Sequence, residues 1–451
     1  MRKYFGTDGI RGEANRELTV DIALRLGYAL GYYLKRENPD KKKIKVIMGC
    51  DTRISGYMLR SAMLAGLTSM GVYVDFVGVI STPAVAYLTK AKKADAGIMI
   101  SASHNPAKDN GLKVFAGNGY KLPDEVELEI ERLMDDPTIL ANPIAGDKVG
   151  KFKYAEDEYY SYRDHLLASV NGDFSGMKIV VDTANGSAYR IAKDVFLALG
   201  AEVVLINDAP NGTNINVRCG STHPEILTKV VVGYEADLGL AYDGDADRLI
   251  AVDRHGNIID GDKIIATLAM GMKRKGELKE NKVVTTVMSN MGFENYLKEN
   301  GIELLRANVG DRYVLEKMIE HNVAIGGEQS GHIILLQYAT TGDGVLTSLK
   351  LVEALRDEKK YLDEMIGDIK DWPQKLVNVV VDNNKKNIWN KNKNITDFIA
   401  QKEKEMEGLG RVLVRTSGTE PLVRVMVEGK EMNMVEKVVN EIAEVVKKEL
   451  A

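Results

Sequence analysis

The sequence predicts three related mixed α/β domains followed by a smaller α+β domain, arranged around a central cleft. At 451 residues the chain is too long for one ordinary core, so three or four domains are expected. A unit of strand, polar turn, helix and strand occurs three times, and such a unit is typical of a parallel crossover. Beyond about residue 370 the pattern changes to alternating strands and an amphipathic helix.

A helix precedes the first unit, with Thr19 as its cap and apolar residues at helical spacing through Leu34. The units themselves begin near Ile44, Lys178 and Lys282, where the strands KIKVIMG, KIVV and KVVTTV run into polar turns. In the last part, GRVLVRTSGTEPLVRVMVEG reads as two strands joined by a glycine-containing turn, and a helix follows from about 432 to 450. We therefore place the four domains at 1–150, 151–252, 253–370 and 371–451.

Each unit adds a further short strand that ends in a polar loop. These loops are SASHNPAKDNG at 101, YDGDADR at 242 and GGEQSGH at 326. Ligands of open α/β sheets bind beyond the carboxyl ends of the strands, where such loops collect. Three equivalent loops with three different chemistries predict one site assembled from three domains.

The composition limits the classes of function. With 45% hydrophobic and 28% charged residues the chain resembles a soluble globular protein, and its net charge of −5 attracts neither nucleic acid nor acidic membranes. No signal peptide and no run of about eighteen apolar residues is present, so we expect a cytoplasmic protein without a membrane span. Cys50 and Cys219 lie far apart and are expected to be reduced and structural.

The loop SASHNP offers Ser103 followed by His104, and an exposed serine on a tight turn is suited to attack. A serine that only caps a helix before the chain-breaking Asn105-Pro106 is an equally good interpretation of this loop alone. No G-x-S-x-G segment is present, which argues against an α/β-hydrolase. Lys113, ten residues on, is positioned to return to the same site as a cation.

The loop DGDADR carries Asp243, Asp245 and Asp247 at alternate positions, so in an extended segment their carboxylates project to one side. Three carboxylates this close repel one another unless a cation lies among them. A calcium-binding EF-hand is excluded, because Arg248 and Arg254 stand where its glycine and its last glutamate belong. The pattern predicts a Mg²⁺ site, against the alternative of an acidic surface turn.

Two further loops have binding chemistry. Glu328 and Ser330 in GGEQSGH, followed by His332, offer groups for hydroxyl- or amine-bearing ligands, although a glycine-rich turn before the strand HIILL is the better interpretation of this loop taken alone. The loop RTSGTEPLVR combines two guanidinium groups, two hydroxyls and free backbone amides, which together favour a phosphate site over a surface hairpin. Its residues are Arg415, Ser417, Gly418, Thr419 and Arg424.

Five segments in this order resemble the α-D-phosphohexomutase family over the whole chain: FGTDGIRG at 5, SASHNP at 101, DGDADR at 243, GEQSGH at 327 and RTSGTEP at 415. GGEQSGHII, CGSTHPE at 219 and TTGDG at 340 are most similar to the bacterial members that act on glucosamine phosphates. Members that act on mannose or glucose phosphates usually differ at Gln329 and often have Gly-His at Gly310-Asp311-Arg312.

The resemblance implies a fold of four domains, three of them alike, and a cycle in which Ser103 is a phosphoserine in the resting enzyme. Glucosamine 6-phosphate would accept this phosphoryl group at O1, and the resulting glucosamine 1,6-bisphosphate would turn and return its 6-phosphate to Ser103. The product, glucosamine 1-phosphate, would feed synthesis of UDP-N-acetylglucosamine. The resemblance also suggests a homodimer.

The same resemblance implies a role for each site residue. Ser103, Asp243, Asp245 and Asp247 would share Mg²⁺. Arg11, Lys113 and Arg248 would offset charge at the reacting phosphoryl group, His104 would orient the phosphoserine, and His332 is the candidate general base. Glu328 and Ser330, with Gly310 and Asp311, would bind the sugar. Arg415, Ser417, Gly418, Thr419 and Arg424 would hold the phosphate that is not reacting.

Three other functions compete with this prediction. The nearest is the same chemistry on mannose or glucose phosphate. A metal-dependent phosphatase would pass the phosphate from the serine to water, but it has no need of a second phosphate site at RTSGTEP. A sugar-phosphate sensor without activity would have no use for Ser103 and the three aspartates together.

Overall fold

The computed structural model describes residues 2–141, 144–382, 385–416 and 421–450, except the side chains of residues 140 and 141. The chain forms two compact units. The first contains Met1–Met288 and Glu303–Ile366, and the second contains Ser289–Ile302 and Gly367–Ala451. No helix in the described ranges is long and apolar enough to cross a membrane.

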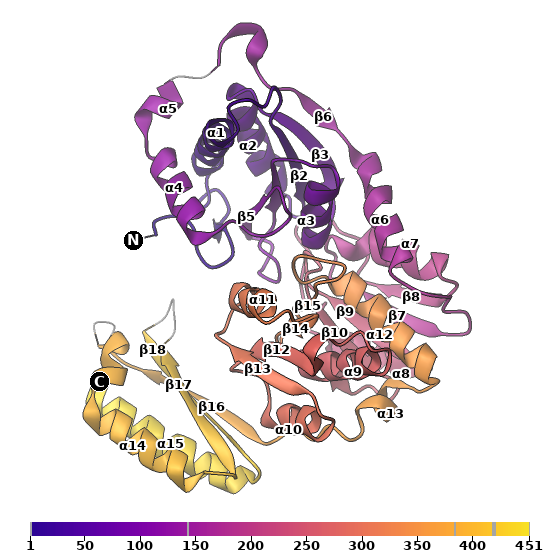
Figure 1. The fold of residues 1–451 in the computed structure, drawn as a ribbon, viewed down its shortest axis with the longest axis vertical. Coiled ribbons are helices and arrows are strands. Elements are labelled where there is room, and N and C mark those ends of the chain that lie inside the picture. The colour runs from indigo at the N-terminus through magenta and orange to yellow at the C-terminus, as the bar shows by residue number, and fades with distance from the viewer. Residues whose placement is uncertain (1, 142–143, 383–384, 417–420, 451) are drawn as a thin grey trace. The chain divides into compact units, whose positions relative to one another are not determined.

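The first unit contains three sheets (Figure 1). The first sheet has the strand order β1-β5-β4-β2-β3-β6. Its strands are β1 (Ile10–Glu13), β2 (Lys45–Cys50), β3 (Tyr73–Val79), β4 (Ala96–Ile100), β5 (Asp109–Ala116) and β6 (Phe152–Tyr154). β2 pairs in parallel with β3 and β4, whereas β5 pairs antiparallel with β4. The sheet is therefore mixed, as the sequence predicts.

The second and third sheets repeat this arrangement. The second has the order β11-β10-β9-β7-β8, and the third has the order β13-β12-β14-β15. In each, a central strand pairs in parallel with two neighbours and the last strand turns back antiparallel. The strands are β7 (Lys178–Asp182), β8 (Glu202–Ile206), β9 (Leu238–Tyr242), β10 (Leu249–Asp253), β11 (Ile258–Ile259), β12 (Lys282–Thr286), β13 (Glu303–Ala307), β14 (Ile325–Gly327) and β15 (Ile333–Leu335). The threefold repeat predicted from the sequence is confirmed.

Helices cover the sheets of the first unit. They are α1 (Val20–Glu37), α2 (Gly56–Ser69), α3 (Thr82–Ala91), α4 (Asp124–Met134), α5 (Pro137–Ala141), α6 (Tyr159–Ala168), α7 (Ala188–Ala198), α8 (Glu225–Gly233), α9 (Gly261–Arg274), α11 (Asp311–Glu320), α12 (Gly344–Glu358) and α13 (Leu362–Ile366). As predicted, Thr19 caps α1, since its side chain accepts a hydrogen bond from the backbone of Ile22.

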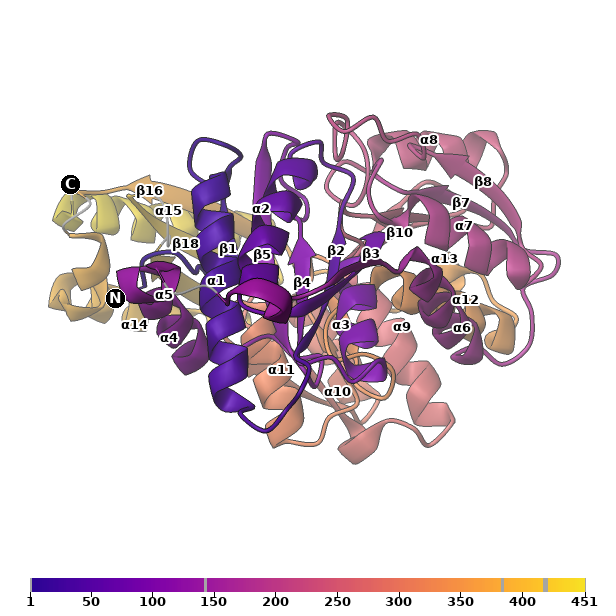
Figure 2. The same ribbon diagram turned by 90° about the horizontal axis from the view of Figure 1, so that it is seen from above.

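Helices α1 and α2 lie side by side against the first sheet (Figure 2). Gly27 and Gly66 face each other there, and a Cβ on Gly27 would come within 3.0 Å of the Cα of Gly66. The absence of side chains at these two positions lets the helices pack closely over the buried strands.

The second unit has one antiparallel sheet in the order β16-β18-β17. Its strands are β16 (Gln374–Val380), β17 (Gly410–Thr416) and β18 (Leu422–Gly429), and its helices are α10 (Met291–Glu299), α14 (Lys393–Glu405) and α15 (Met432–Leu450). α14 and α15 pack on one face of the sheet (Figure 1), where Val423, Val425 and Val427 of β18 meet apolar residues of α15. The smaller α+β domain predicted for this part is confirmed, with β16 and α14 in addition to the predicted elements.

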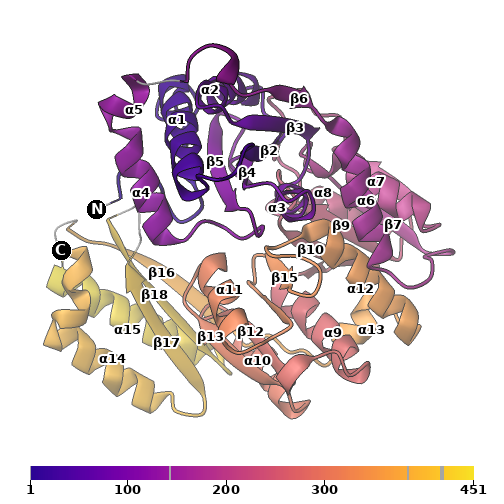
Figure 3. The same cartoon turned by 45° about the horizontal axis from the view of Figure 1, so that its top comes forward.

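Each of the three predicted polar loops is the turn of an antiparallel hairpin at the end of its sheet. SASHNP joins β4 to β5, DGDADR joins β9 to β10, and GGEQSGH spans β14 to β15. In Figure 3 the β4–β5 hairpin reaches toward β10 and β15. The same position in each repeat thus carries a different set of reactive side chains.

Candidate active site

Ser103 lies in the turn after β4 with a backbone φ of 53°, a left-handed conformation that few residues other than glycine adopt. Its backbone N–H donates to the Ser101 hydroxyl at 2.9 Å. The side chain is only 2% exposed, so the expectation of an exposed serine is wrong. The serine is buried because the Asp243 loop covers it, and its Oγ donates to Asp243 Oδ2 at 2.6 Å.

A buried arginine from the neighbouring turn shapes the serine loop. Arg53 follows β2, is 2% exposed, and forms an ion pair with Asp51 at 2.8 Å. Its guanidinium donates to four backbone carbonyls of the loop, at Ser103, Asn105, Pro106 and Asp109. Asn216 of the second repeat also donates to the carbonyl of Ser103, at 2.9 Å. The unusual backbone of Ser103 is therefore held by charged and amide donors from two repeats.

Asp243, Asp245 and Asp247 gather at the end of β9, and one oxygen of each lies within 4.8 Å of the others. The segment is a turn rather than the extended strand expected from the alternating pattern, with Ala246 at a φ of 57°. The turn brings the carboxylates together because the chain must reverse into β10 here. The prediction that the three carboxylates lie on one side is confirmed, but a turn and not an extended strand brings them there.

The carboxylate cluster fits a divalent cation. All three side chains are buried, and Asp245 Oδ1 and Asp247 Oδ1 are enclosed without a hydrogen-bond donor among the described residues. Burial and the charges of Asp247 and Asp245 raise the pKa of Asp243 well above its usual range. Buried carboxylates that lack donors and repel one another are the ligand set that a hard cation satisfies.

Lysines offset part of this negative charge. Lys113 on β5 places Nζ 2.8 Å from Asp245 Oδ2 and 2.9 Å from Asp8 Oδ2, as the prediction of a returning cation requires. Burial disfavours its ammonium group, but the carboxylates of Asp245 and Asp8 outweigh this effect and raise the pKa of Lys113. Asp8 also pairs with Lys121 at 2.5 Å and with Arg11. Through Asp8 and Lys113, Arg11 is thus connected to the cluster of aspartates.

His104 and Arg248 flank the serine and the aspartates. His104 Nδ1 lies 3.3 Å from Ser103 Oγ. Burial, with the charges of Arg248 and Arg11, lowers the pKa of His104 to about 4, so the ring is neutral at neutral pH. The backbone N–H of Arg248 donates to Asp243 Oδ1 at 3.2 Å, and its Nε lies 3.8 Å from Asp247 Oδ1.

The third hairpin brings His332 to this cluster. His332 is buried, with Nδ1 3.6 Å from Asp247 Oδ2 and Nε2 3.6 Å from Asp311 Oδ2. Burial opposes protonation of the ring, but Asp247 and Asp311 together raise the pKa of His332. Asp311, at the start of α11, pairs in turn with Lys121 at 2.5 Å.

The predicted sugar-binding residues lie next to His332. Glu328 is half-buried and accepts from the backbone N–H of Gly310 at 3.2 Å, so the two segments chosen from the sequence do meet. Ser330 is exposed on the same turn. Gln329 donates to Asp260 at 3.0 Å and therefore supports the turn.

In the second unit, Arg415 on β17 and Arg424 on β18 are direct partners across the strand pair. Both are half-buried. Burial and the charge of Arg424 lower the pKa of Arg415, as expected for two like charges held opposite each other. An anion between them would relieve this repulsion. Ser417, Gly418 and Thr419 lie outside the described residues.

Sequence reasoning missed several residues that hold the site together: Asp8, Arg53, Thr82, Lys121 and Asn216. Thr82 at the start of α3 donates to Asp245 Oδ2 at 2.5 Å. Asp8 stands in FGTDGIRG, one of the segments that carry the family resemblance, and Arg53 stands in CDTRISG, the polar turn after the first strand of the repeat, so the sequence contained a signal for these two residues. Lys121 and Asn216 carry no signal, because only the folded chain brings them near the loops.

Comparison with known domain families assigns nearly the whole chain. Residues 2–139, 158–256 and 260–371 match the families described as phosphoglucomutase/phosphomannomutase alpha/beta/alpha domains I, II and III. Residues 376–445 match the phosphoglucomutase/phosphomannomutase C-terminal domain. The chain belongs to this family, the α-D-phosphohexomutases. It is therefore an isomerase of the phosphomutase class.

Individual relatives agree with this assignment. The chain is 72% identical over 451 residues to a phosphoglucosamine mutase of Fusobacterium nucleatum subsp. nucleatum, with 100% of both chains covered. Its fold is similar to a phosphoglucomutase/phosphomannomutase family protein of Burkholderia thailandensis, with a TM-score of 0.81, 23% identity and coverage of 98% and 96%. A second similar structure is N-acetylphosphoglucosamine mutase of Aspergillus fumigatus in complex with GlcNAc-6P and magnesium, with a TM-score of 0.67, 17% identity and coverage of 100% and 96%.

Proposed function

We propose that the chain interconverts glucosamine 6-phosphate and glucosamine 1-phosphate, with Ser103 as the phosphate carrier and glucosamine 1,6-bisphosphate as the intermediate. The observation that carries this proposal is the position of Ser103 Oγ, 2.6 Å from Asp243 within the cluster of three aspartates. A hydroxyl held against a cation site is arranged for reversible phosphorylation. The choice of a glucosamine phosphate rests on the 72% identity to a phosphoglucosamine mutase over the full chain.

Asp243, Asp245 and Asp247 would hold Mg²⁺, together with the phosphate on Ser103. The ion, when bound, supplies positive charge that stabilises the phosphoryl oxygens during transfer. Thr82 and Lys113 both contact Asp245 Oδ2 and fix the direction of this carboxylate. Asp245 Oδ1, the other oxygen of this carboxylate, is buried without a donor among the described residues.

In the first transfer, O1 of glucosamine 6-phosphate attacks the phosphorus carried by Ser103. The bond from phosphorus to O1 forms, the bond to Ser103 Oγ breaks, and the proton of the O1 hydroxyl is passed on by a base, for which His332 is the candidate. That proton ends on Ser103 Oγ, whose hydroxyl then forms the hydrogen bond to Asp243 seen in the structure. Lys113, Arg11 and Arg248 provide the positive charges that surround these oxygens.

In the second transfer the bisphosphate has turned. Ser103 Oγ attacks the 6-phosphoryl group, the bond from phosphorus to O6 breaks, and the proton leaving Oγ ends on O6. Glucosamine 1-phosphate is released and the phosphoserine is restored, so protons and phosphoryl groups balance over the cycle. Glu328, Ser330, Gly310 and Asp311 would bind the sugar in both orientations.

The phosphate that is not reacting would bind at Arg415 and Arg424, with Ser417, Gly418 and Thr419 between them in sequence. Two guanidinium groups opposed across a strand pair favour a dianion. A separate site for this second phosphate suits a mutase, because hydrolysis of a phosphoserine by water does not need one.

A substrate panel tests the proposal. Turnover of glucosamine, mannose and glucose 6-phosphates is compared with Mg²⁺ and a catalytic amount of the matching 1,6-bisphosphate. We expect glucosamine 6-phosphate to have the highest kcat/KM. A clear preference for mannose or glucose phosphate would keep the mechanism and change the substrate, and release of inorganic phosphate from every sugar would support a phosphatase instead.

A further inference from the structure

The loop TTGDG, from Thr340 to Gly344, connects the region after β15 to α12 and has no role in the cycle described so far. It contacts all three repeats of the first unit. Thr340 donates through its hydroxyl to the carbonyl of Gly119 at 2.6 Å, and the backbone of Gly344 donates to Ala246 at 3.0 Å. The backbone of Asp343 donates to Ile333 at 3.2 Å. The loop is therefore tied to the strand that follows His332 and to the turn that carries the aspartates.

Within this loop, Gly342 lies directly against the imidazole of His332. Its backbone N–H donates to His332 Nε2 at 3.1 Å. A Cβ on Gly342 would come within 2.6–2.7 Å of the Cε1, Nε2 and Cδ2 atoms of the ring, closer than atoms pack. The position therefore requires glycine, and the ring rests on the glycine backbone with a donor that fixes its direction.

Asp343 holds this loop in place. Its carboxylate is 2% exposed, caps α12 by accepting from Leu346 at 2.9 Å, and accepts from the Tyr162 hydroxyl of α6 at 2.7 Å. Gly344, the first residue of α12, lies directly against the second repeat, since a Cβ on Gly344 would overlap the carbonyl of Arg248. The loop thus has little freedom to move away from His332.

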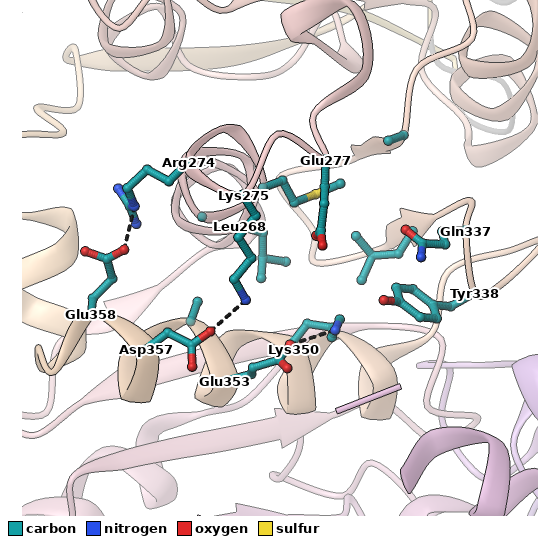
Figure 4. A pocket seen from close by; sticks show the side chains of 15 residues that line it. Leu268, Arg274, Lys275, Glu277, Gln337, Tyr338, Lys350, Glu353, Asp357 and Glu358 are labelled. Atoms are coloured by element: carbon teal, nitrogen blue, oxygen red, sulfur yellow. Dashed lines mark hydrogen bonds and ion pairs between the residues drawn. The ribbon is translucent and has the colours of Figure 1, made fainter. Parts of the chain in front are cut away.

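Helix α12, which follows the loop, is anchored to neighbouring segments (Figure 4). Lys350 donates to the carbonyl of Ser169 at 2.7 Å, and Glu353 accepts from the backbone of Asn171 at 2.8 Å, which anchors α12 to the segment after α6. The same helix is joined to the end of α9 through Lys275–Asp357 at 2.6 Å and Arg274–Glu358 at 2.5 Å. Figure 4 shows these pairs around a small pocket of about 70 Å³ between the two helices. Because they join neighbouring helices, the charges around this pocket serve the packing of α12.

We propose that Gly342 and Asp343 are positioning residues for phosphoryl transfer, which hold the His332 ring in place beside Asp247 and Asp311 through the TTGDG loop. The proposal rests on the proposed function, in which His332 acts in the transfer. Gly342 contacts His332 directly, and Asp343 acts through the loop and its bond to Tyr162. Neither residue needs to touch the sugar phosphate.

A double-mutant cycle of Gly342→Ala and His332→Ala tests the proposal. Gly342→Ala alone displaces the ring, and misplacement by about 1 Å can cost roughly a hundredfold in rate, so kcat should fall by ten- to a hundredfold with KM within threefold. In the His332→Ala background the ring is gone, and the added methyl group has room. We expect Gly342→Ala to cause no further loss of kcat there, and the melting temperature to recover toward that of His332→Ala alone.

Several outcomes would overturn the proposal. They are an equal loss of kcat from Gly342→Ala in both backgrounds, wild-type kcat in Gly342→Ala, and wild-type kcat in His332→Ala. The cycle is run on whichever sugar phosphate the wild-type enzyme turns over best. A failure of the glucosamine assignment is therefore seen in the wild type, and a failure of the positioning role is seen only in the variants.

Tyr162→Phe tests the loop without a steric clash, with Tyr160→Phe on the same helix as its matched control. Tyr162→Phe removes the hydroxyl that holds Asp343, so kcat should fall several-fold with KM unchanged. Tyr160 is 46% exposed, and its change should leave kcat as in the wild type. Equal kcat in the two variants would overturn the role of Asp343.

Discussion

The serine and aspartate loops of the first unit differ from the arginine pair of the second unit in how their charged and polar groups are buried and held. Ser103, Asp243 and Asp245 are almost fully buried, and short hydrogen bonds link each of them to a neighbouring repeat. Arg415 and Arg424 are only half-buried and face each other as like charges on adjacent strands. The first region fixes the direction and spacing of its side chains, whereas the second brings two positive charges close together.

This difference matches the two demands of moving a phosphate within one sugar. The reacting phosphoryl group must meet its donors and acceptors at one fixed geometry in every transfer. The other phosphate is at C6 in one half of the cycle and at C1 in the other, so its site must accept two ligand orientations. We therefore expect changes in the first region to act mainly on kcat, and changes in the second to act mainly on KM.

The largest effect is expected for Ser103→Ala, which removes the phosphate carrier. Turnover should fall to background, and the phosphate that intact-mass spectrometry finds on the wild-type chain should be missing. Because the buried serine donates to a carboxylate, a contact that contributes roughly 1.5–3 kcal/mol, the melting temperature should also fall by a few degrees. Ser61→Ala, which changes a serine exposed on α2, is the control and should keep both activity and phosphate. Wild-type turnover in Ser103→Ala would end the carrier assignment.

The second effect is expected for Asp245→Asn, which removes one charge from the cluster of aspartates. We expect kcat to fall by about 10²–10³, as for the loss of one group that stabilises charge in the transition state. Mg²⁺ should raise the melting temperature of the wild type and have little effect on the variant, because binding to the folded state alone stabilises it. An unchanged Mg²⁺ requirement would leave the three aspartates as a structural turn.

A smaller effect, on KM rather than kcat, is expected for Arg424→Ala. A guanidinium contact to a phosphate contributes roughly 1.5–3 kcal/mol, so KM should rise about ten- to a hundredfold. The variant should also release more free 1,6-bisphosphate per turnover, measured with labelled substrate, because the turning intermediate is held less tightly. Arg424→Lys should restore part of the affinity. If KM and bisphosphate release both stay at wild-type values, this strand pair is not the second phosphate site.

The smallest effect is expected for Thr82→Val, which removes one donor to Asp245 but keeps the shape of the side chain. Lys113 still contacts the same carboxylate oxygen, so a loss of about 1 kcal/mol, or roughly fivefold in kcat, is expected. KM should not change. A rise in KM with constant kcat would contradict the division of labour between the two regions.

The sequence was sufficient for the threefold repeat and for the reactive loops, because both leave local signals. Strand, turn and helix recur at readable spacing, and each reactive loop follows directly on a buried strand. Lys113 could be placed near the site because it follows Ser103 by only ten residues, on the far side of the same polar loop. The alternating aspartates indicated a shared side, although a turn and not an extended strand brings them together.

The environment of these loops could not be predicted, because it depends on contacts between distant residues. The burial of Ser103 comes from the Asp243 loop, 140 residues away, and from Arg53. The contact between Gly342 and His332 depends on the folded path of the TTGDG loop, which the sequence marks only as part of the family resemblance. Local patterns gave the chemistry of the groups, and tertiary packing gave their geometry.

The most direct test of the central claim follows the phosphate itself. Enzyme carrying unlabelled phosphoserine is mixed with glucosamine 6-phosphate labelled in its phosphate, stopped after single turnovers, and digested for mass spectrometry. Ser103 should acquire the label at the rate at which glucosamine 1-phosphate appears, and the 1,6-bisphosphate should be the intermediate. Formation of glucosamine 1-phosphate while Ser103 stays unlabelled would contradict the mechanism.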